Sequence, residues 1–305
     1  MPSEFEIIRR YFSRPARSAL LGVGDDAALV EPAAGCELAV STDLLLAGRH
    51  FAARAAPRAL GHKALAVNLS DMAAMGATPR WATLALALPS ADEAWLEEFA
   101  AGFYALAARF KVDLVGGDTT RGPLALCVTI LGEVPRGRAL RRDGAQPGDD
   151  VWVSGELGGA AFALEHPEDA AAEKRLHEPE PRVALGERLR GLASAAIDVS
   201  DGFTQDLGHV LERSGVGAVV RYADLPKFRI ADPALEQRCV LAGGDDYELA
   251  FTAPQAARAR IESLAAPLGV ALARVGSIQA GAPRLELLDA QGRAMDVEPG
   301  YDHFA

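Results

Sequence analysis

The sequence is short of the features that mark secreted, membrane-spanning or zinc-stabilised proteins. It has three cysteines in 305 residues, far apart and with no CxxC pair, which excludes a disulfide framework and a cysteine-based zinc site. It has no run of 18 apolar residues, so we expect no membrane span. Its first residues, MPSEFEIIRRYF, lack the apolar core of a signal peptide, and we expect a cytoplasmic protein.

Basic residues are outnumbered as well. Lys and Arg total 31 against 42 Asp and Glu, which gives a formal net charge of -11 and a pI near 5.1. No basic cluster offsets this excess, so we expect no nucleic-acid partner. The acids allow a different route to phosphates, because carboxylates bind divalent cations and these cations bind phosphate oxygens.

Common ion- and phosphate-binding motifs are absent. The chain has neither the P-loop GxxxxGK[ST] nor the dinucleotide fingerprint GxGxxG, and DVSDGFTQDLGH does not fit the EF-hand pattern. Two glycine-rich segments, GGDTTRG at 116–122 and SGELGGAA at 154–161, place flexible backbone where amides could approach phosphates. SGELGGAA also fits a tight strand-to-helix turn, which is the reading we favour.

Short apolar stretches rich in Val, Leu and Ile predict strands, and segments with helical spacing lie between them. The predicted strands are Leu38–Ser41, Thr83–Leu88, Leu124–Leu131, Val151–Ser154 and Ala195–Val199. The predicted helices are Arg58–Met75, which stops at Gly76, and Asp92–Phe110, which Asp92 caps. This alternation predicts an α/β (α+β) fold.

The segment Pro135–Asp150, rich in Arg, Gly and Pro, is the predicted domain boundary. It divides the chain into an N-terminal domain at residues 1–137 and a C-terminal α/β domain at residues 138–305. Roughly two domains are also what this length predicts. Within the second domain, the charged and proline-rich stretch His166–Glu180 is expected to be an exposed insertion.

Aspartates recur beside small residues at the ends of apolar runs. They occur in GVGDD (Asp25, Asp26), VSTD (Asp43), LVGGD (Asp118), IDVSD (Asp198, Asp201) and LAGGDD (Asp245, Asp246). A further acid, Asp71, is three residues from Asn68 in KALAVNLSDMAAMGA, so the two project from the same helix face.

Two interpretations of these aspartates are open. A single Asp after a strand is commonly a helix cap or a turn former. Five such sites predict more, because strand ends in an α/β fold converge on one ligand crevice. Carboxylates gathered there repel one another unless cations neutralise them, and Mg²⁺, which takes a few carboxylates plus water and phosphate oxygens, is the expected ion.

Seven motifs together resemble the thiamine-monophosphate kinase family. In chain order they are GVGDDAAL, VSTDLLLAGRHF, KALAVNLSDMAAMGATP, LVGGDTTRG, IDVSDGF, GGDDYEL and GYDHF, and they span nearly the whole chain. The resemblance implies the two-domain fold of the superfamily that includes aminoimidazole ribonucleotide synthetase and selenophosphate synthetase, with N-terminal sheets paired in a homodimer. It also implies that ATP, with several Mg²⁺ ions, phosphorylates thiamine monophosphate to thiamine diphosphate.

The resemblance implies site residues motif by motif. The metal ligands would be Asp26, Ser41 (through a backbone oxygen), Thr42, Asp43, Asp71, Asp118, Asp198 and Asp201. The ATP contacts would be Tyr104, Gly117, Asp118, Arg142 and Ser200, and the thiamine-side contacts His50, Glu248 and Tyr301. Many members read GGEDYEL where this chain has Asp245, so either Asp245 or Glu248 faces the substrate.

The residues themselves favour direct transfer with no catalytic side chain. A phosphate oxygen is already ionised near pH 7, so it attacks without a general base, and no Ser–His–Asp or Cys–His arrangement suggests one. Two polyanions must still be neutralised and aligned. Arg142 in RALRRDG is either a cationic clamp on ATP or a solvated linker arginine, and Tyr301 either stacks on the thiamine rings or packs as a terminal aromatic.

Other functions remain open. A selenophosphate synthetase should have a reactive cysteine in a glycine-rich N-terminal segment, which Cys36 in EPAAGCEL does not match. An aminoimidazole ribonucleotide synthetase should have a GVDS…GTK-like segment, which is absent. A non-catalytic, metal-stabilised binding protein would release no ADP in the presence of thiamine monophosphate.

Overall fold

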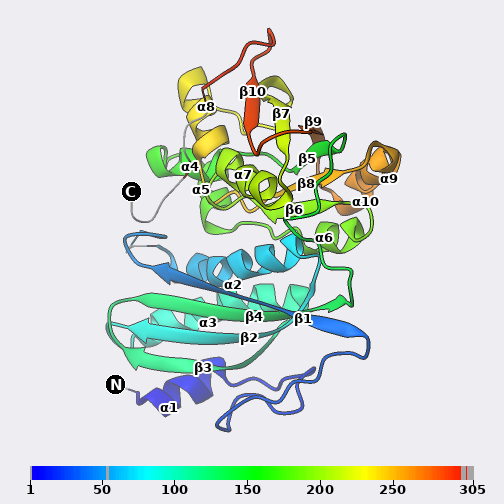
Figure 1. Cartoon of the computed structure of the whole chain (residues 1–305). Helices are drawn as coiled ribbons and strands as arrows, with labels where there is room; N and C mark the ends of the chain where they lie inside the picture. The colour runs from blue at the N-terminus through cyan, green and yellow to red at the C-terminus, as the bar shows by residue number, and fades with distance from the viewer. Residues whose placement is uncertain (1, 53–54, 297–299, 301–305) are drawn as a thin grey trace. The chain divides into compact units, whose positions relative to one another are not determined.

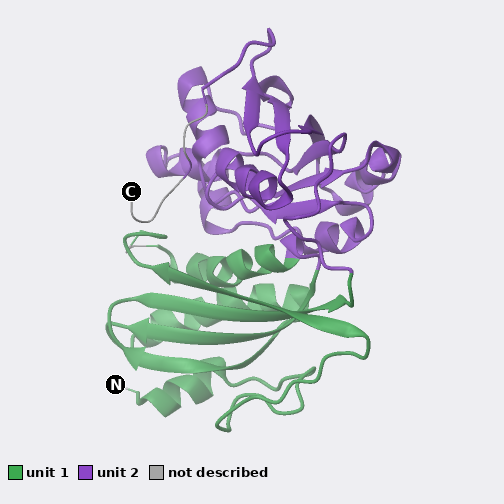
Figure 2. Ribbon diagram, viewed as in Figure 1, with its two compact units in different colours: residues 1–72, 77–137 green, residues 73–76, 138–305 purple. Residues whose placement is uncertain are grey.

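The computed structural model describes residues 2–52, 55–296 and 300 of the chain. It divides into two compact units, unit 1 at residues 1–72 and 77–137 and unit 2 at residues 73–76 and 138–305 (Figure 2). In this described part of the chain, no helix has the length and apolar character needed to cross a membrane.

Unit 1 is a four-stranded mixed sheet with two long helices, α2 and α3, on one face (Figure 1). In sheet order its strands are β1 (Cys36–Leu46), β4 (Ala125–Pro135), β2 (Thr78–Leu88) and β3 (Asp113–Arg121). Strands β1 and β2 run antiparallel to β4, and β3 runs parallel to β2. The helices are α1 (Glu4–Ile7), a π-helical turn (Ile8–Phe12), α2 (Pro57–Ala74) and α3 (Glu93–Phe110).

The two faces of the unit 1 sheet differ in character. On β2 and β4, side chains on the helix side, such as Leu84 and Val128, are buried, and they alternate with less buried side chains that point the other way. On that other face β1 carries Leu38, Val40, Leu44 and Leu46, whose exposed fractions are 40%, 60%, 51% and 36%. We call this second face the open face.

Helices α2 and α3 cross at two glycines. A Cβ atom at Gly61 would lie 2.1 Å from the carbonyl oxygen of Phe99, and one at Gly102 would lie 1.9 Å from the carbonyl oxygen of Arg58. No side chain fits at either position, so the two helix backbones are in direct contact. This contact fixes α2, which carries Asp71, against α3.

Unit 2 contains a six-stranded mixed sheet in the order β10-β7-β9-β5-β8-β6. Its strands are β5 (Asp150–Ser154), β6 (Ala195–Asp198), β7 (Gly217–Arg221), β8 (Leu249–Ala253), β9 (Leu272–Gln279) and β10 (Leu285–Leu288). Its helices are α4 (Gly159–Glu165), α5 (Ala170–His177), α6 (Val183–Leu189), α7 (Phe203–Ser214), α8 (Pro233–Ala242), α9 (Arg258–Glu262) and α10 (Ala265–Leu268), with 3-10 turns at Tyr222–Asp224 and Gln255–Ala257.

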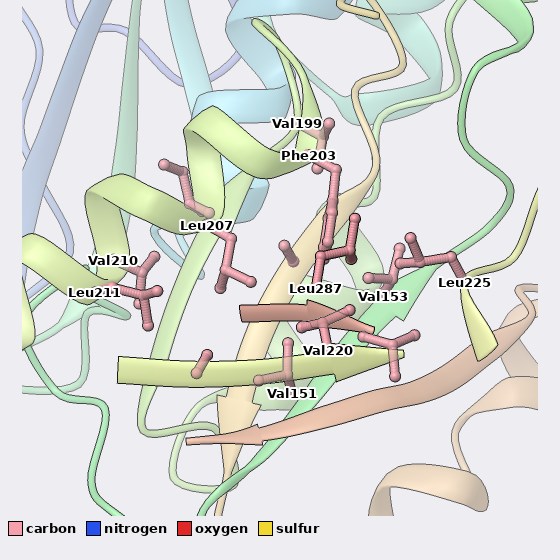
Figure 3. Packing of buried hydrophobic residues seen from close by; sticks show 14 of the residues in the cluster. Val151, Val153, Val199, Phe203, Leu207, Val210, Leu211, Val220, Leu225 and Leu287 are labelled. Atoms are coloured by element: carbon pink, nitrogen blue, oxygen red, sulfur yellow. The ribbon is translucent and has the colours of Figure 1, made fainter. Parts of the chain in front are cut away.

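An apolar core joins α7 to the unit 2 sheet. Phe203 and Leu207 of α7 pack in one cluster with Val151 and Val153 of β5 and Val220 of β7 (Figure 3). Each of these five side chains is at most 1% exposed. The beginning of α7 is therefore fixed by packing, and so is the end of the loop that leads into it.

The strands and helices predicted from the sequence are each found, as β1, β2, β4, β5, β6, α2 and α3, and the α/β class is confirmed. The structure lengthens the strand predicted at Leu38–Ser41 to Cys36–Leu46. At the start of α3, the Asp92 carboxylate accepts hydrogen bonds from the backbone N–H groups of Ala94 and Trp95, as a capping aspartate should.

The prediction of an exposed insertion at His166–Glu180 is wrong. Residues Ala170–His177 of this stretch form α5, and Ala172 and Leu176 of that helix are 0% and 6% exposed. They pack with residues of α4 and α8 in a second apolar cluster of unit 2. The two apolar residues are four apart and so share a helix face, a signal that the surrounding charges obscured.

Candidate functional site

The aspartates predicted to follow strand ends occupy several kinds of position. Asp198 is the last residue of β6, as predicted. Asp43 and Asp118 instead lie inside β1 and β3, and Asp245 precedes β8 rather than following a strand. The expectation that all these acids gather where strands end is therefore wrong, because small residues before Asp also occur within strands.

Three of the predicted metal ligands lie on the helix side of unit 1. Ser41 and Asp43 are two residues apart on β1 and so share a face. The Ser41 hydroxyl donates to the Asp71 carboxylate of α2 at 2.5 Å. Asn68, on the same helix, is fully buried and donates to the Ala64 carbonyl at 3.1 Å. The structure thus brings Ser41 and Asp71 together. The Asn68 side chain instead is buried and bonds to the backbone of its own helix.

Thr42 and Asp118 lie on the open face instead. The Thr42 hydroxyl shares a hydrogen bond of 2.8 Å with the hydroxyl of Thr129, its direct partner on β4. Asp118 pairs in register with Ala85, and Ala85 pairs with Cys127. Directly paired residues point to the same side of a sheet, so Asp118 belongs to the face opposite Ser41 and Asp43.

Gly117, the predicted nucleotide contact before Asp118, is required by its backbone. Its φ angle is +149°, and a Cβ atom there would lie 1.9 Å from the carbonyl oxygen of Leu84 on β2. Only glycine permits this approach between the two strands. The GGDTTRG segment is therefore a strand with a close contact to its neighbour, and Gly117 has a structural reason to be glycine whether or not it binds a nucleotide.

Asp25 and Asp26 lie in an exposed turn. Leu21 and Leu29 form an antiparallel bridge at its base, where the Leu29 N–H donates to the Leu21 carbonyl at 2.9 Å. Both aspartates are exposed, and the Asp26 N–H donates to the Asp25 carboxylate at 2.9 Å. The turn presents two carboxylates to solvent.

His50 lies in the turn that follows β1. Its Nδ1 accepts the backbone N–H of Leu46 at 3.0 Å, so this nitrogen carries no proton. The neutral ring then holds its proton on Nε2, the nitrogen that points away from this bond. His50 is thereby a donor at Nε2 and is poorly suited to accept a proton there.

Tyr104 and Arg142 are in contrasting surroundings. The buried Tyr104 hydroxyl donates to the Phe12 carbonyl at 2.9 Å, the Arg14 guanidinium lies 3.6 Å from its ring centre, and burial raises its pKa to about 12. Arg142 is exposed in a turn, and its guanidinium has no ion pair within the described residues. Its neighbour Arg141 is paired with Asp143. Arg142 is thus able to meet an external anion, whereas the Tyr104 hydroxyl is already engaged.

The loop that follows β6 wraps around one carboxylate. The backbone N–H groups of Ser200, Asp201 and Gly202 all donate to Asp206 Oδ2, at 3.0, 3.1 and 3.2 Å. Burial and the charges of Asp198 and Asp201 raise the pKa of Asp206 to about 7. Asp206 is not among the site residues predicted from the sequence, although an acid four residues after a glycine at a helix start is a recognisable signal.

The segment before β8 runs alongside this loop in a strained conformation. The Asp245 N–H donates to the Ser200 carbonyl and the Tyr247 N–H to the Val199 carbonyl, both at 2.8 Å. Asp245 and Tyr247 have φ angles of +67° and +52°, which cost energy in residues other than glycine. The Tyr247 hydroxyl donates to the Asp245 carboxylate at 2.9 Å. Strain of this kind is concentrated at functional sites.

Glu248 forms an ion pair inside unit 2. Its carboxylate accepts hydrogen bonds from Nε of Arg182 at 2.7 Å, from Nη2 of the same guanidinium, and from the Ser154 hydroxyl at 2.6 Å. The residue is 3% exposed. Gly155 lies against the same carboxylate, since a Cβ atom there would be 1.8 Å from one of its oxygens. Arg182, which the sequence analysis also missed, therefore satisfies Glu248.

Asp246 accepts the N–H of Gly158, 2.7 Å away, in the turn between β5 and α4. SGELGGAA is thus the strand-to-helix turn that we favoured, with at least one of its amides occupied by a carboxylate of the same unit. A cradle for phosphate would need that amide to be unoccupied.

Within the described residues, no three or more His, Cys, Asp or Glu side chains form a ready-made metal centre. The donors that the sequence predicted are all oxygens, as Mg²⁺ requires, and Mg²⁺ needs few protein ligands when phosphates supply others. Tyr301 lies outside the described residues. Gly300, directly before it, lies against the loop that follows β6, since a Cβ atom at Gly300 would be 2.5 Å from the Asp201 carbonyl oxygen.

Comparison with known proteins places these features in a family. Residues 24–134 match the N-terminal domain and residues 146–287 the C-terminal domain of AIR synthase related proteins. The chain is 44% identical to thiamine-monophosphate kinase of Salmonella typhimurium, over 99% of this chain and 98% of that protein.

Solved structures agree. The crystal structure of thiamine-monophosphate kinase from Stenotrophomonas maltophilia has a TM-score of 0.86 and 46% identity, covering 95% of each chain. AaThiL complexed with AMPPCP and TMP has a TM-score of 0.77 and 30% identity, covering 92% of each chain. On full-length identity, shared fold and both domains, the chain belongs to the thiamine-monophosphate kinase family.

Proposed function

We propose that this protein transfers the γ-phosphoryl group of ATP to thiamine monophosphate, giving thiamine diphosphate and ADP. The observation that carries the proposal is the full-length match to thiamine-monophosphate kinases, among them AaThiL, which was solved with AMPPCP and TMP together. A protein that holds an ATP analogue and the phosphate acceptor at once is suited to direct transfer between them.

The protein's oxygen donors would hold Mg²⁺. In unit 1 these are Asp26, Ser41, Asp43 and Asp71, and in unit 2 they are Asp198 and Asp201. The contact of Ser41 with Asp71 and the loop that carries Asp201 support this assignment. When bound, Mg²⁺ would neutralise phosphate charge and help align the two reacting phosphates. The Thr42 hydroxyl is engaged by Thr129, so Thr42 contributes in this proposal through its backbone.

The same proposal assigns the organic substrates. Gly117, Asp118, Ser200 and Arg142 would contact ATP, and Arg142 is the side chain best placed to clamp an anion because it is exposed and has no described ion-pair partner. Tyr104 is not assigned an ATP contact, because its buried hydroxyl is already bound to the Phe12 carbonyl.

On the thiamine side, the proposal names His50, Tyr301 and one acid. The Glu248 carboxylate is buried and satisfied by Arg182, whereas Asp245 sits in a strained backbone beside the 198–202 loop. We therefore assign Asp245 to the substrate and give Glu248 a structural part.

The chemistry needs no general base. The attacking oxygen of thiamine monophosphate is already anionic, and His50, which accepts a hydrogen bond at Nδ1, holds its neutral-form proton on Nε2. The alcohol of free thiamine would have to lose a proton as it attacks. We therefore expect the monophosphate to react and free thiamine to be essentially inert, without a phosphoenzyme.

The open face supports a homodimer. Leu38, Val40, Leu44 and Leu46 expose apolar side chains along β1, two on each side of Thr42, and β1 is an edge strand of its sheet. Exposed apolar stripes and edges of this kind are commonly covered by a partner. A second copy of unit 1, sheet against sheet, would bury them.

The experiment measures ADP release with ATP and each of a panel of acceptors, together with ATP–ADP isotope exchange in the absence of an acceptor. We expect turnover with thiamine monophosphate and none above background with thiamine or without acceptor. Asp71→Asn should reduce turnover by orders of magnitude, whereas Asp92→Asn, at a helix cap, should not.

Three results would count against the proposal. Absence of ADP release with thiamine monophosphate would favour a binding protein. Efficient thiamine turnover would reveal a base, and robust acceptor-free exchange would reveal a phosphoenzyme.

A further inference from the structure

Asp206 occupies an unusual place for an acid. It is 3% exposed, and one of its oxygens accepts three successive backbone N–H groups, those of Ser200, Asp201 and Gly202. Asp198 and Asp201 lie close enough to act on it electrostatically. Burial and the two neighbouring carboxylates disfavour a charge on Asp206, whereas the three backbone N–H donors favour it.

The position of Asp206 is fixed from behind. Its own N–H donates to the Gly202 carbonyl at 3.0 Å, which closes the first turn of α7. Phe203 and Leu207 on either side of it are buried in the unit 2 core (Figure 3), and the Thr204 hydroxyl donates to the Leu241 carbonyl of α8 at 2.9 Å. The Asp206 carboxylate is therefore a fixed point on which the loop is built.

The loop is held on its carbonyl side as well. The Ser200 carbonyl accepts the Asp245 N–H, and the Val199 carbonyl accepts the Tyr247 N–H. With N–H groups bound to Asp206 and carbonyls bound to the segment before β8, the backbone from Val199 to Gly202 has little freedom. Gly202 adds to this, because its φ is +118° and a Cβ atom there would be 2.8 Å from the Ala242 carbonyl carbon.

We infer that Asp206 is a positioning residue. It contacts neither ATP nor Mg²⁺ but sets the backbone of Ser200 and Asp201, so that the Asp198, Ser200 and Asp201 oxygens are arranged before the metal–nucleotide complex arrives. This inference rests on the proposed function, which assigns Asp198 and Asp201 to Mg²⁺ and Ser200 to ATP. Preorganisation of this kind lowers the ordering cost of binding.

The test compares Asp206→Asn and Asp206→Glu with Asp169→Asn. Asp169 is a matched control, since its carboxylate also accepts backbone N–H groups at a helix start of unit 2, from Ala171 and Ala172 at 3.0 Å each. Calorimetry measures the affinity for AMPPCP with Mg²⁺, and the melting temperature without ligand checks folding. We expect at least tenfold weaker binding for both Asp206 variants, a raised KM for ATP, and wild-type binding for Asp169→Asn.

The glutamate variant separates geometry from charge. It keeps the negative charge but moves the carboxylate by one methylene. A purely electrostatic role of Asp206 predicts that Asp206→Glu binds AMPPCP as wild type does, and this result would overturn the inference. Wild-type binding by Asp206→Asn would also overturn it. If Asp206→Asn does not fold, the test rests on Asp206→Glu. Amide hydrogen exchange of residues 200–202 should then be faster in Asp206→Glu than in wild type, and unchanged exchange would overturn the inference.

The proposed function and this inference fail separately. Wild-type protein that binds AMPPCP with Mg²⁺ but releases no ADP with thiamine monophosphate would contradict the function alone. Wild-type turnover together with unchanged nucleotide binding in both Asp206 variants would contradict the positioning role alone.

Discussion

Single residues in this protein are constrained by backbone geometry as much as by chemistry. Gly117 shows this most directly, because both its φ angle and the Leu84 carbonyl exclude a side chain. Its neighbour Gly116 is different, since a Cβ atom there would make only an ordinary contact of 3.7 Å with a methyl group of Thr83. Two adjacent glycines of one motif thus have different reasons to be present.

We predict that Gly117→Ala lowers the free energy of unfolding by at least about 2 kcal/mol, because β3 must move away from β2. Gly116→Ala should change it by no more than about 0.5 kcal/mol. Urea unfolding of the two variants provides the measurement. Equal stabilities would show that β3 adjusts its backbone without cost.

Residue-scale prediction from the sequence succeeded where a local rule applies. The Asp92 cap follows from its place before a helical pattern. Asn68 and Asp71 do share a helix, but the sequence could not show that Asn68 is buried while Asp71 meets Ser41 of β1, because that depends on which strand packs against α2. Arg182 and Glu248 are 66 residues apart, and no local pattern relates them.

At the scale of elements, carboxylates join segments by holding backbone amides. Asp246, before β8, holds the turn before α4 through the Gly158 N–H. Burial, together with the charge of Glu248, raises the pKa of Asp246 to about 8, although hydrogen bonds from backbone N–H groups and the charge of Arg175 oppose the shift. The contact is therefore sensitive to pH.

The sign follows from linkage. The ordinary aspartate pKa is 3.8, so between about pH 4 and pH 8 the unfolded chain releases a proton that the folded chain keeps. Asp246 therefore lowers the free energy of unfolding progressively as the pH rises through this window, and the effect levels off above pH 8. We predict that Asp246→Asn, which cannot ionise, becomes progressively more stable relative to wild type from pH 5 to pH 8.

Denaturation midpoints of the two proteins at several pH values provide the test. Curves that stay parallel across the window would show that Asp246 is ionised in the folded protein. Crossing in the opposite direction would show that its amide partners outweigh burial.

Element prediction worked for periodic segments and failed where periodicity was short or masked. The long helix α3 and the apolar strands are evident because their patterns repeat. Asp43 and Asp118 were expected at strand ends because small residues before an aspartate are typical of turns. In the structure, strand pairing continues past both residues, as far as Leu46 in β1 and Arg121 in β3. Helix α5 has only two buried apolar residues in a charged stretch, too few to reveal its spacing.

At the scale of the whole molecule, the open face of unit 1 is the feature that a single chain leaves unexplained. If the proposed homodimer forms through this face, Val40→Glu and Leu44→Glu should each raise its dissociation constant at least tenfold, because burying such an apolar side chain contributes about 1.5–3 kcal/mol and a buried glutamate is costly without a partner. Analytical ultracentrifugation over a range of protein concentrations measures the mass in solution, and from it the dissociation constant.

Leu164→Glu is the control, since Leu164 is an equally apolar side chain, 71% exposed, on α4 of unit 2. It should leave the dimer intact. A wild-type protein that is monomeric at micromolar concentration, or a Val40→Glu variant that remains as dimeric as wild type, would rule out this face as the interface.

The glycine crossing of α2 and α3 has a consequence for motion. With Gly61 against the Phe99 carbonyl and Gly102 against the Arg58 carbonyl, there is no compressible layer of side chains on which one helix could slide over the other. Shear motions are small slides of packed helices past one another, and direct backbone contact at two points opposes such a slide. Any displacement of Asp71 along the axis of α2 should therefore move α2 and α3 together. Its hinges can only lie outside the two helices, in the connections at their ends.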